Sequence, residues 1–436
     1  MAGEPWAEWP FEEVIDFQEG PGILARDFCE HGVPLVRLSG LERGRSVLEG
    51  CNYLDPVTVR ERWAHFALQQ GDILLSTSAS LGRIAVVSAD AVGAIPYTGI
   101  IRMRPRDERL YGPFIRYLLE GPEFQQQAEV VGVGSVIRHF GPMHLRQMSV
   151  RLPSPREQRA IAHVLGTLDD RIELHRRMND TLEAIARGLF KSWFVDFDPV
   201  RAKAEGRDPG LPKHLADLFP DGFEESELGE IPRGWRVATV HELAEINART
   251  LSAADSLDVI DYIEISEVMR GEIGSVPRYL RGTEPSRARR RLRHGDSVVS
   301  TVRPDRGAHF LCLNPPETLI ASTGFAVLSP RDGSWALLHC ALTRPDVGEE
   351  FGRLADGGAY PAIRPEAIAS LTLAMPPGAD LPSSFQKLAA PLFDRTHQNR
   401  SEAKTLTALR DTLLPRLISG DLRVQDAERF IAEHAL

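Results

Sequence analysis

Cysteine is scarce in this sequence, which has four cysteines among 436 residues. Cys29, Cys51, Cys312 and Cys340 are too far apart for a CxxC metal knuckle and too few for a disulfide framework. No apolar run is long enough to span a membrane, and residues 1–10 lack the basic and apolar regions of a signal peptide. We therefore expect a cytoplasmic protein with reduced, structural thiols and no membrane partner.

The sequence also lacks a complete catalytic motif. Residues 314–317 (NPPE) resemble the motif of amino-methyltransferases, but Glu317 stands where an aromatic ring would stack on the flipped base. Residues 131–134 (VGVG) are too short and badly placed for a nucleotide-binding fingerprint, and there is no P-loop. Asp196 and Asp198 stand before a proline in a pattern more typical of a cap or turn than of a metal site. No catalytic residue, metal or cofactor is therefore expected on this chain.

Positive charge is in the minority, with 51 Lys and Arg against 61 Asp and Glu and a formal net charge of −10. This balance argues weakly against DNA binding, because contacts to phosphate need lysine and arginine. The charge is nevertheless uneven, since residues 278–294 (RYLRGTEPSRARRRLRH) hold seven arginines and one acid, Glu284. That segment is either a solvated arginine-rich hairpin or a surface that contacts nucleic acid.

Two long stretches carry apolar residues at alternating steps of four and three, which is typical of a coiled-coil seam. The first runs from Ile161 to Trp193 and the second from Phe385 to Leu417, at a constant offset of 224 residues. We expect two antiparallel helices that pack on each other, although each could instead be an ordinary core helix. The seam includes Leu165, Leu168, Ile172, His175, Asn179, Leu182 and Leu189 in the first stretch and Leu392, Thr396, Asn399, Leu406 and Leu413 in the second. The polar members would fix the register or admit a partner protein.

The segments before the two stretches repeat the same landmarks. Residues 71–76 and 295–300 each read as a turn that leads into a buried strand, and Asp296 follows Asp72 by 224 residues. Thr323 follows Thr98 by 225 residues in a second shared turn. A chain of this length is also too long for one core. We therefore predict an α+β protein built as a tandem repeat with approximate two-fold symmetry, in which each copy is a module of short strands followed by a long helix.

Motifs around the first long helix resemble one known family. Residues 152–158 (LPSPREQ), 161–165 (IAHVL), 168–172 (LDDRI) and 189–200 (LFKSWFVDFDPV) closely resemble the central region of the specificity (S) subunit of type I restriction-modification systems. The duplication fits the same family, so the resemblance spans the whole chain. One departure is that Ser384-Phe385-Gln386 stand where the family has Glu-Gln before the second helix, which leaves the start of that helix open.

The resemblance implies a domain order. We expect a first target recognition domain over residues 1–152, a central helix over 153–197, a Pro/Gly-rich connector over 198–234, a second recognition domain over 235–375, a second helix over 376–420 and a tail over 421–436.

The resemblance also implies a non-catalytic DNA reader and scaffold. In that family each recognition domain reads one half of a split double-stranded DNA sequence, and the paired helices hold the two domains a fixed distance apart. Two methyltransferase (M) subunits would dock on the helices, and restriction (R) subunits would bind through them. S-adenosylmethionine, ATP and Mg²⁺ would then be cofactors of the partner subunits and not of this chain.

DNA contacts are expected in loops of the two modules, where Ser, Thr, Arg and Tyr suit groove edges and phosphate oxygens. Each candidate could instead belong to a surface turn with a capping hydroxyl. The candidates in the first module are Ser76, Thr77, Ser78, Arg83, Ser135, Arg138 and His139. Those in the second module are Arg287, Arg289, Arg290, Arg291, Thr301, Arg303, Arg306, Tyr360 and Arg364.

Two other functions stay open on the sequence. One is a self-contained DNA methyltransferase or nuclease that uses the helix pair for dimerisation, which the lack of a complete catalytic motif disfavours. The other is a coiled-coil scaffold that never touches DNA. Salt-dependent DNA affinity in the presence of M separates this scaffold from a DNA reader.

Overall fold

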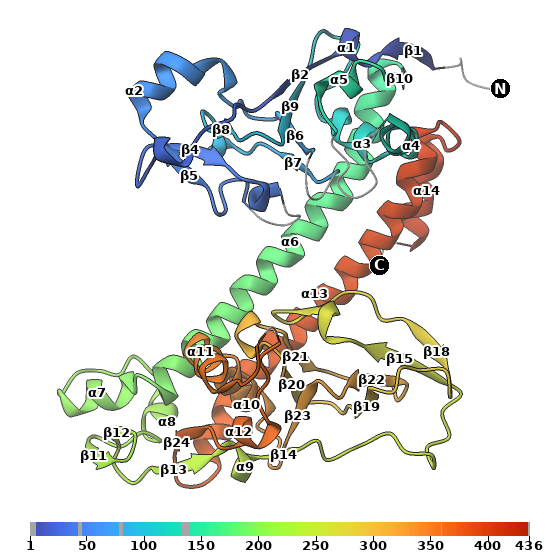
Figure 1. The fold of residues 1–436 in the computed structure, drawn as a ribbon. Helices are drawn as coiled ribbons and strands as arrows, with labels where there is room; N and C mark the ends of the chain where they lie inside the picture. The colour runs from blue at the N-terminus through green and yellow to red at the C-terminus, as the bar shows by residue number, and fades with distance from the viewer. Residues whose placement is uncertain (1–5, 42–45, 78–81, 132–139, 359, 435–436) are drawn as a thin grey trace. The chain divides into compact units, whose positions relative to one another are not determined.

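A computed structural model describes the chain except for residues 1–5, 42–45, 78–81, 132–139, 359 and 435–436. The chain divides into two units, each with one module of short strands and parts of both long helices (Figure 1). Unit 1 comprises Met1–Arg177 and Arg400–Leu436, and unit 2 comprises Met178–Asn399. Because helices are mixed with largely antiparallel sheets in each unit, the fold is of the α+β class, as predicted.

The module of unit 1 contains two four-stranded sheets. Its strands are β1 (Ala7–Pro10), β2 (Ile15–Glu19), β3 (Phe28–Cys29), β4 (Val33–Val36), β5 (Asn52–Leu54), β6 (Ile73–Ser76), β7 (Ile84–Val86), β8 (Ile95–Pro96), β9 (Ile100–Pro105) and β10 (Ser149–Leu152). Its helices are α1 (Phe11–Val14), α2 (Pro56–Thr58), α3 (Phe114–Glu120), α4 (Pro122–Val131) and α5 (Pro142–Leu145), with short turns η1 (Ala25–Asp27), η2 (Leu38–Leu41), η3 (Val59–Trp63), η4 (Ala64–Phe66) and η5 (Ala89–Ala91). One sheet has the antiparallel order β2-β9-β6-β7, and the other has the order β3-β5-β4-β8 with β4 and β8 parallel. Strands β1 and β10 form a separate antiparallel pair.

The module of unit 2 is built in the same way. Its strands are β13 (Arg236–Thr239), β14 (Ala244–Ile246), β15 (Val259–Ile263), β16 (Val268–Met269), β17 (Glu272–Ile273), β18 (Arg278–Leu280), β19 (Ala288–Arg291), β20 (Asp296–Ser300), β21 (His309–Cys312), β22 (Leu319–Ser322), β23 (Phe325–Pro330) and β24 (Thr372–Met375). Its helices are α9 (Val240–Leu243), α10 (Trp335–Leu342), α11 (Pro345–Leu354) and α12 (Pro365–Ala369), with short turns η6 (Ile265–Glu267) and η7 (Pro304–Arg306). The sheets have the orders β14-β23-β20-β21 and β18-β15-β22-β19, beside the pairs β13-β24 and β16-β17.

The two modules share their order of elements. The sheet β2-β9-β6-β7 recurs as β14-β23-β20-β21, and the parallel pair β4-β8 recurs as β15-β22. The outer strands of the second sheets differ, because β3 lies beyond β5 in unit 1 whereas β19 lies beyond β22 in unit 2. The order of elements therefore repeats along the chain, in agreement with the repeated landmarks.

The shared Gly-Asp landmark has one structural role in both modules. Gly71 and Gly295 adopt φ angles of 84° and 85°, in the left-handed region that favours glycine. The carboxylate of the next residue, Asp72 or Asp296, accepts a hydrogen bond at 2.7 Å from the backbone N–H three residues before it. This turn feeds the central strands β6 and β20, in which every residue is buried. The landmark therefore marks the entry to the core of each module.

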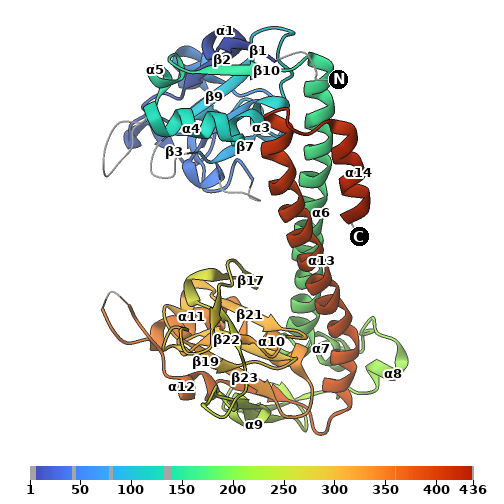
Figure 2. The ribbon, with the colours of Figure 1, turned by 90° about the vertical axis from the view of Figure 1, so that its right-hand side faces the viewer.

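The two long helices, α6 (Pro155–Phe194) and α13 (Asp380–Ile418), pack on each other within each unit (Figure 2). In unit 1 the first half of α6 shares a core with the last half of α13. In unit 2 the rings of Phe190, Trp193 and Phe194, at the end of α6, contact Phe385 near the start of α13. The helices are therefore antiparallel within each unit.

The apolar seam positions all lie at least partly inside the protein. Leu165, Leu168, Ile172, Leu406 and Leu413 are buried, and Leu182, Leu189 and Leu392 are half-buried. Near its ends α6 buries further residues outside the seam, including Val164 and Phe190, because the modules also pack on it. The buried stripe there is wider than a two-helix seam, as is usual for a core helix.

Polar side chains are buried in the middle of the helix pair. In unit 2 the side-chain amide of Asn399 donates to Oδ1 of Asn179 at 2.9 Å. In unit 1 Nε2 of His175 lies 3.3 Å from a carboxylate oxygen of Glu402. An apolar substitution of one asparagine would leave the other amide buried and unpaired, so this pair favours one register of the helices.

The second long helix begins at Asp380, so Ser384-Phe385-Gln386 lie within its first two turns. In unit 1 the side-chain oxygen of Gln158 accepts a hydrogen bond at 2.7 Å from the backbone N–H of Tyr111, ahead of α3. In unit 2 the side-chain oxygen of Gln386 accepts one at 2.9 Å from the backbone N–H of Ala336 in α10. A glutamine therefore anchors a module helix in both units, and the second stands about one turn deeper in its own helix.

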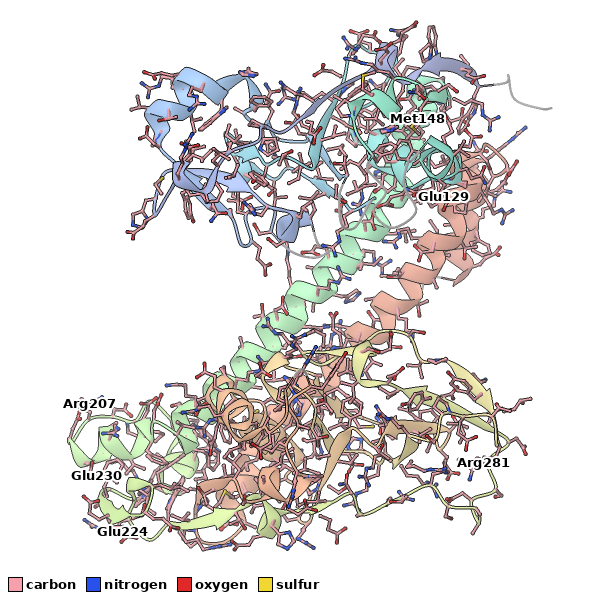
Figure 3. The ribbon with its side chains drawn as sticks, viewed as in Figure 1. Glu129, Met148, Arg207, Glu224, Glu230 and Arg281 are labelled. Carbon is pink, nitrogen blue, oxygen red and sulfur yellow. The ribbon has the colours of Figure 1, made fainter. Side chains whose placement is uncertain are left out.

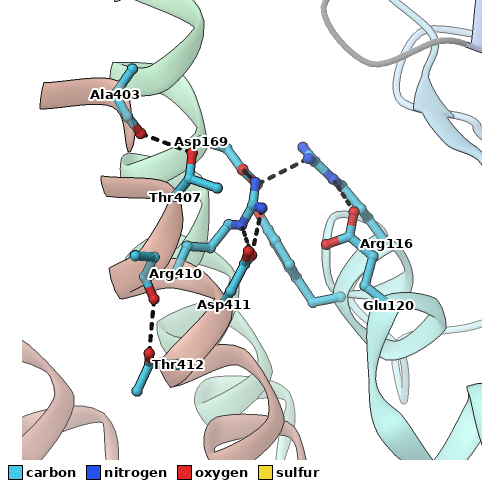
Figure 4. Close-up of polar contacts among 10 residues, drawn as sticks. Arg116, Glu120, Asp169, Ala403, Thr407, Arg410, Asp411 and Thr412 are labelled. Atoms are coloured by element: carbon cyan, nitrogen blue, oxygen red, sulfur yellow. Dashed lines mark hydrogen bonds and ion pairs between the residues drawn. The ribbon is translucent and has the colours of Figure 1, made fainter. Parts of the chain in front are cut away.

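Charged residues are buried where α3, α6 and α13 meet in unit 1 (Figure 4). Asp169 on α6 accepts a hydrogen bond from Arg410 on α13 at 2.8 Å and one from the Tyr117 hydroxyl on α3 at 3.0 Å. A second guanidinium, that of Arg116, lies 3.1 Å from the same carboxylate. Burial raises the pKa of Tyr117, so its hydroxyl keeps the proton that it donates. One carboxylate therefore joins three helices.

The connector and the tail both contain regular structure. The connector holds α7 (Asp198–Ala204), α8 (Lys213–Ala216) and the hairpin of β11 (Phe223–Ser226) with β12 (Gly229–Pro232). Residues 421–436 were expected to be a tail without an element, but α14 (Val424–His434) forms there. Its Ala427 is fully buried in the core of unit 1, which explains why the segment is ordered as a helix.

Candidate nucleic-acid interface

The loop that follows β20 in unit 2 is held by two other segments of the module. On one side, the backbone N–H of Arg303 donates to the carbonyl of Pro361, ahead of α12, at 2.8 Å. On the other side, the N–H of Arg270 in the β16–β17 turn donates to the carbonyl of Gly307 at 2.7 Å. Three segments that are far apart in sequence therefore meet at one place on the module surface.

An arginine and an aromatic ring lie together at this place. The guanidinium of Arg303 lies 4.5 Å from the ring centroid of Tyr360, whose side chain is 72% exposed. The backbone of Arg303 is left-handed, with φ of 47°, and hydrogen bonds from both sides of the loop hold it there. A stacked arginine and an exposed tyrosine can contact phosphate oxygens and base edges.

The other predicted contacts of this loop differ in exposure. Arg306 and Arg364 are exposed, so their guanidinium groups can reach a ligand. Thr301 is 8% exposed, and its hydroxyl donates to the carbonyl of Gly324 at 2.8 Å. The structure thus gives Thr301 a role in holding the loop.

Arg270 was missed by the sequence analysis. It is exposed and adopts a left-handed backbone, with φ of 46°, in the two-residue turn that it forms with Gly271. Its sequence signal is a short Xaa-Gly turn between two apolar pairs, which is typical of a tight hairpin. The position of that turn beside the loop after β20 could not be deduced from the sequence.

The arginine-rich segment is largely neutralised within unit 2. Arg278 lies 2.7 Å from the carboxylate of Asp261, and its hydrogen bond lowers the pKa of that acid. Arg281, labelled in Figure 3, lies 2.6 Å from the carboxylate of Glu284. Two further arginines of the segment pair with acids, Arg291 with Asp255 and Arg293 with Asp296. These pairs reduce the net positive charge that the segment offers to a ligand.

The remaining predicted contacts of this segment lie at different depths. Arg287 is exposed, and Nε of Arg289 donates to the carbonyl of Ser286 at 3.1 Å. Arg290 is half-buried, and burial lowers the pKa of its guanidinium. Contact of Arg287, Arg289, Arg290 and Arg291 with DNA stays a prediction.

The corresponding loop of unit 1 follows β6. Ser76 has no exposed surface, and its hydroxyl accepts a hydrogen bond from the backbone N–H of Arg83 at 2.9 Å. Thr77 is 4% exposed, and its N–H donates to the carbonyl of Gly99. These bonds close the base of the loop, and Arg83 is half-buried beside it. Four further predicted contacts, Ser78, Ser135, Arg138 and His139, lie outside the described residues.

Metal-binding and membrane-spanning features were also sought. Among the described residues, no three His, Cys, Asp or Glu side chains lie close enough together to hold a metal ion. Within the same residues, no helix combines the length and the apolar character that crossing a bilayer requires. All four cysteines are free thiols.

Known proteins resemble this chain over most of its length. A family model described as the type I restriction modification DNA specificity domain matches residues 4–184. The type I restriction enzyme HindI specificity subunit of Haemophilus influenzae is 25% identical over 403 residues, which cover 82% of this chain and 87% of that protein. The type I restriction enzyme MjaIX specificity subunit of Methanocaldococcus jannaschii is 23% identical over 363 residues, which cover 82% and 79%. The chain belongs to the family of type I restriction-modification specificity subunits.

A solved structure supports the fold assignment for this specificity subunit. The crystal structure of the S subunit from M. genitalium superposes with a TM-score of 0.54 at 15% identity, covering 96% of this chain and 97% of that one. The matched domain, residues 4–184, includes the module of unit 1 and most of α6. Specificity subunits are the non-catalytic components of their complexes, in agreement with the missing catalytic motifs.

Proposed function

We propose that this specificity subunit reads a two-part double-stranded DNA target, with one half read by the module of each unit. The observation that carries the proposal is the recurrence of one sheet order in two modules, each with a loop after its central strand. A repeated reading module suits a target with two separate parts, because each module can contact one stretch of the duplex.

The loop after β20 supports DNA contact by the second module. Arg270, Arg303 and Arg306 belong to the segments that meet there, and Tyr360 offers an exposed ring. Arginine and tyrosine are suited to phosphate and base contacts, and local positive charge compensates for an overall charge of −10. In the first module the same role falls to Arg83 and to the predicted contacts around it.

The long helices would act as the spacer between the two reading modules. In this proposal α6 and α13 form one continuous antiparallel coiled coil whose length sets the unread gap in the DNA. A helix of 40 residues is about 60 Å long at about 1.5 Å per residue. The buried Asn179–Asn399 pair supports a fixed register, since sliding the helices would separate the two amides.

The helices would also dock the catalytic partners. Two M subunits would bind this chain, one for each half, and R subunits would bind through them. S-adenosylmethionine for adenine methylation, and ATP with Mg²⁺ for cleavage, would be held by those partners. The exposed faces of α6 and α13, which leave Leu174, Ile185 and Leu388 open, suit such docking.

Removal of two arginines from the loop after β20 tests DNA contact. We expect Arg303→Ala combined with Arg306→Ala to weaken binding of the complex with M to its target duplex. The log–log dependence of affinity on salt should become shallower by about two, because each lost phosphate contact removes about 0.9 from the slope. The measurement is a titration of labelled duplex between about 50 and 200 mM salt.

A matched variant removes two arginines elsewhere in unit 2. Arg207→Ala with Arg233→Ala takes away the same charge from the connector, where both side chains are more than 60% exposed. An equal loss of slope in this control would show a general charge effect and contradict the proposed contact. Wild-type affinity that does not depend on salt would favour the scaffold without DNA contact. Methylation of DNA by the purified chain alone would favour a self-contained methyltransferase.

A further inference from the structure

A pocket of unit 1 lies beside the closed base of the loop after β6. Its volume is about 470 Å³, and its lining includes Glu19, Thr77 and Gly99 together with the segment that leads into α5. Thr77 is the last described residue before the predicted contact Ser78, and Phe140 is the first after the predicted contact His139. The pocket is therefore bordered by both segments in which DNA contacts of this module are predicted.

The carboxylate of Glu19 is positioned in this pocket by neighbouring backbone. Its Oε1 accepts hydrogen bonds from the backbone N–H of Gly99 at 3.1 Å and from the hydroxyl of Thr98 at 3.4 Å. The following residue must be glycine, since a Cβ on Gly20 would lie 2.1 Å from the carbonyl oxygen of Pro96. The strand end is thus fixed closely, and the carboxylate with it.

The equivalent place in unit 2 carries the opposite hydrogen-bonding character. Phe17 pairs with Met103 as Ile246 pairs with Leu328 in the matching strands, so the residue that corresponds to Glu19 is Ala248. The carboxylate is therefore absent from the second module at this position.

A cation replaces it from the neighbouring segment. Gly141 precedes the first proline of α5 and lines the pocket of unit 1. The residue before the first proline of α12 is instead Arg364, which is exposed. One module therefore offers a fixed acceptor at this place, and the other offers a guanidinium donor.

We propose that these two positions read the equivalent base of each half-site with opposite polarity. Glu19 accepts a hydrogen bond from an exocyclic amino group, cytosine N4 or adenine N6, in the half-site read by unit 1. Arg364 donates to O6 and N7 of guanine in the half-site read by unit 2. This inference rests on the proposed function, which it deepens by naming the base chemistry at one position of each half.

The chemistry of the major groove supports this assignment. Amino groups of cytosine and adenine are the donors there, carboxylates accept from them, and arginine pairs with both acceptors of guanine. A carboxylate near a duplex is repelled by phosphates, so it gives no general affinity. Its hydrogen bond to an amino group offsets that repulsion only at the correct base, which makes Glu19 a specificity residue.

Mapping of methylated sites in cells that carry the chain with its M partner tests the proposal. We expect Glu19→Ala to reduce discrimination at one base of one half-site by about ten- to a hundred-fold, with the other half-site unchanged. We expect Arg364→Ala to relax one guanine position in the other half-site only. Glu19→Gln, which keeps an acceptor for Gly99, should admit new bases at the first position and shows the effect if the alanine variant fails to fold.

The controls separate this inference from the proposed function. Glu129→Ala removes an exposed carboxylate from α4 of the same unit, and should leave both half-sites unchanged. Unaltered base preferences in both Glu19 variants, with a two-part site in the wild type, would overturn the reading by Glu19 alone. A wild-type chain that directs no two-part methylation would overturn the proposed function itself.

Discussion

Replacement of Asp169 by alanine is expected to destabilise unit 1 by about 3–5 kcal/mol, because it leaves buried cations uncompensated. Asp169 is shared by Arg116 and Arg410, whose side chains are 22% and 3% exposed. Without the carboxylate the two guanidinium groups would repel each other in a region with little water. Asp411 and Glu120 pair with them as well, but Asp411 is 59% exposed and provides a weaker interaction.

The double variant Asp169→Ala with Arg410→Ala should lose less stability than the sum of the two single variants. A coupling of about 1–3 kcal/mol is expected for residues in one ionic network. The duplicated chain offers an apolar alternative, since residues 224 positions away in each direction, Phe393 and Ala186, are both buried. Asp169→Phe with Arg410→Ala copies that solution and should also be more stable than Asp169→Ala.

Hydrogen exchange measured peptide by peptide gives the stability of each unit separately. Protection in Asp169→Ala should fall in α3, in the first half of α6 and in the last half of α13, while the module of unit 2 serves as an internal reference. A loss below about 1 kcal/mol would place this ion group among ordinary surface pairs. An equal loss in both modules would show that the ion group does not act locally.

Insertion of seven residues into each long helix is expected to change the DNA target as a whole. The insertions belong beside Asn179 in α6 and beside Asn399 in α13, where the buried amides meet. Seven residues preserve the alternation of four and three and add about 10 Å of helix. If the helices set the gap, the unread spacer should grow by about three base pairs at about 3.4 Å per step, and both half-sites should stay the same.

Methylation of the original target should then be lost, since one half-site would lie at the wrong distance. Insertion into α6 alone is the matched control, because it separates Asn179 from Asn399 and should impair folding or assembly. A four-residue insertion in both helices would rotate the seam and serves as a second control. An unchanged spacer in the seven-residue variant would contradict a ruler made of α6 and α13.

Local patterns in the sequence predicted much of the fold. The steps of four and three predicted both long helices, because side chains three and four apart share a helix face. The pairs Gly71-Asp72 and Gly295-Asp296 predicted a turn before a buried strand, because φ and the short carboxylate bond are local properties. Such features depend on neighbouring residues, so one sequence suffices to find them.

The candidate site could be predicted only in part, because its contacts join distant segments. Arg278 and Arg291 read as free charge in the sequence, but Asp261 and Asp255, 17 and 36 residues earlier, pair with them. Arg270 joins the site only because its turn packs on Gly307. The buried partnership of Asp169 and Arg410 spans 241 residues, and no local pattern marks it.

Mapping of every methylated adenine in cells that carry the wild-type chain with its M partner tests the central claim most directly. Two reading modules predict one motif with two defined parts separated by a gap of fixed length and free sequence. Exchange of the unit 2 module for that of another specificity subunit should then alter one part and leave the other intact. A single uninterrupted motif, or methylation that does not depend on this chain, would contradict the account.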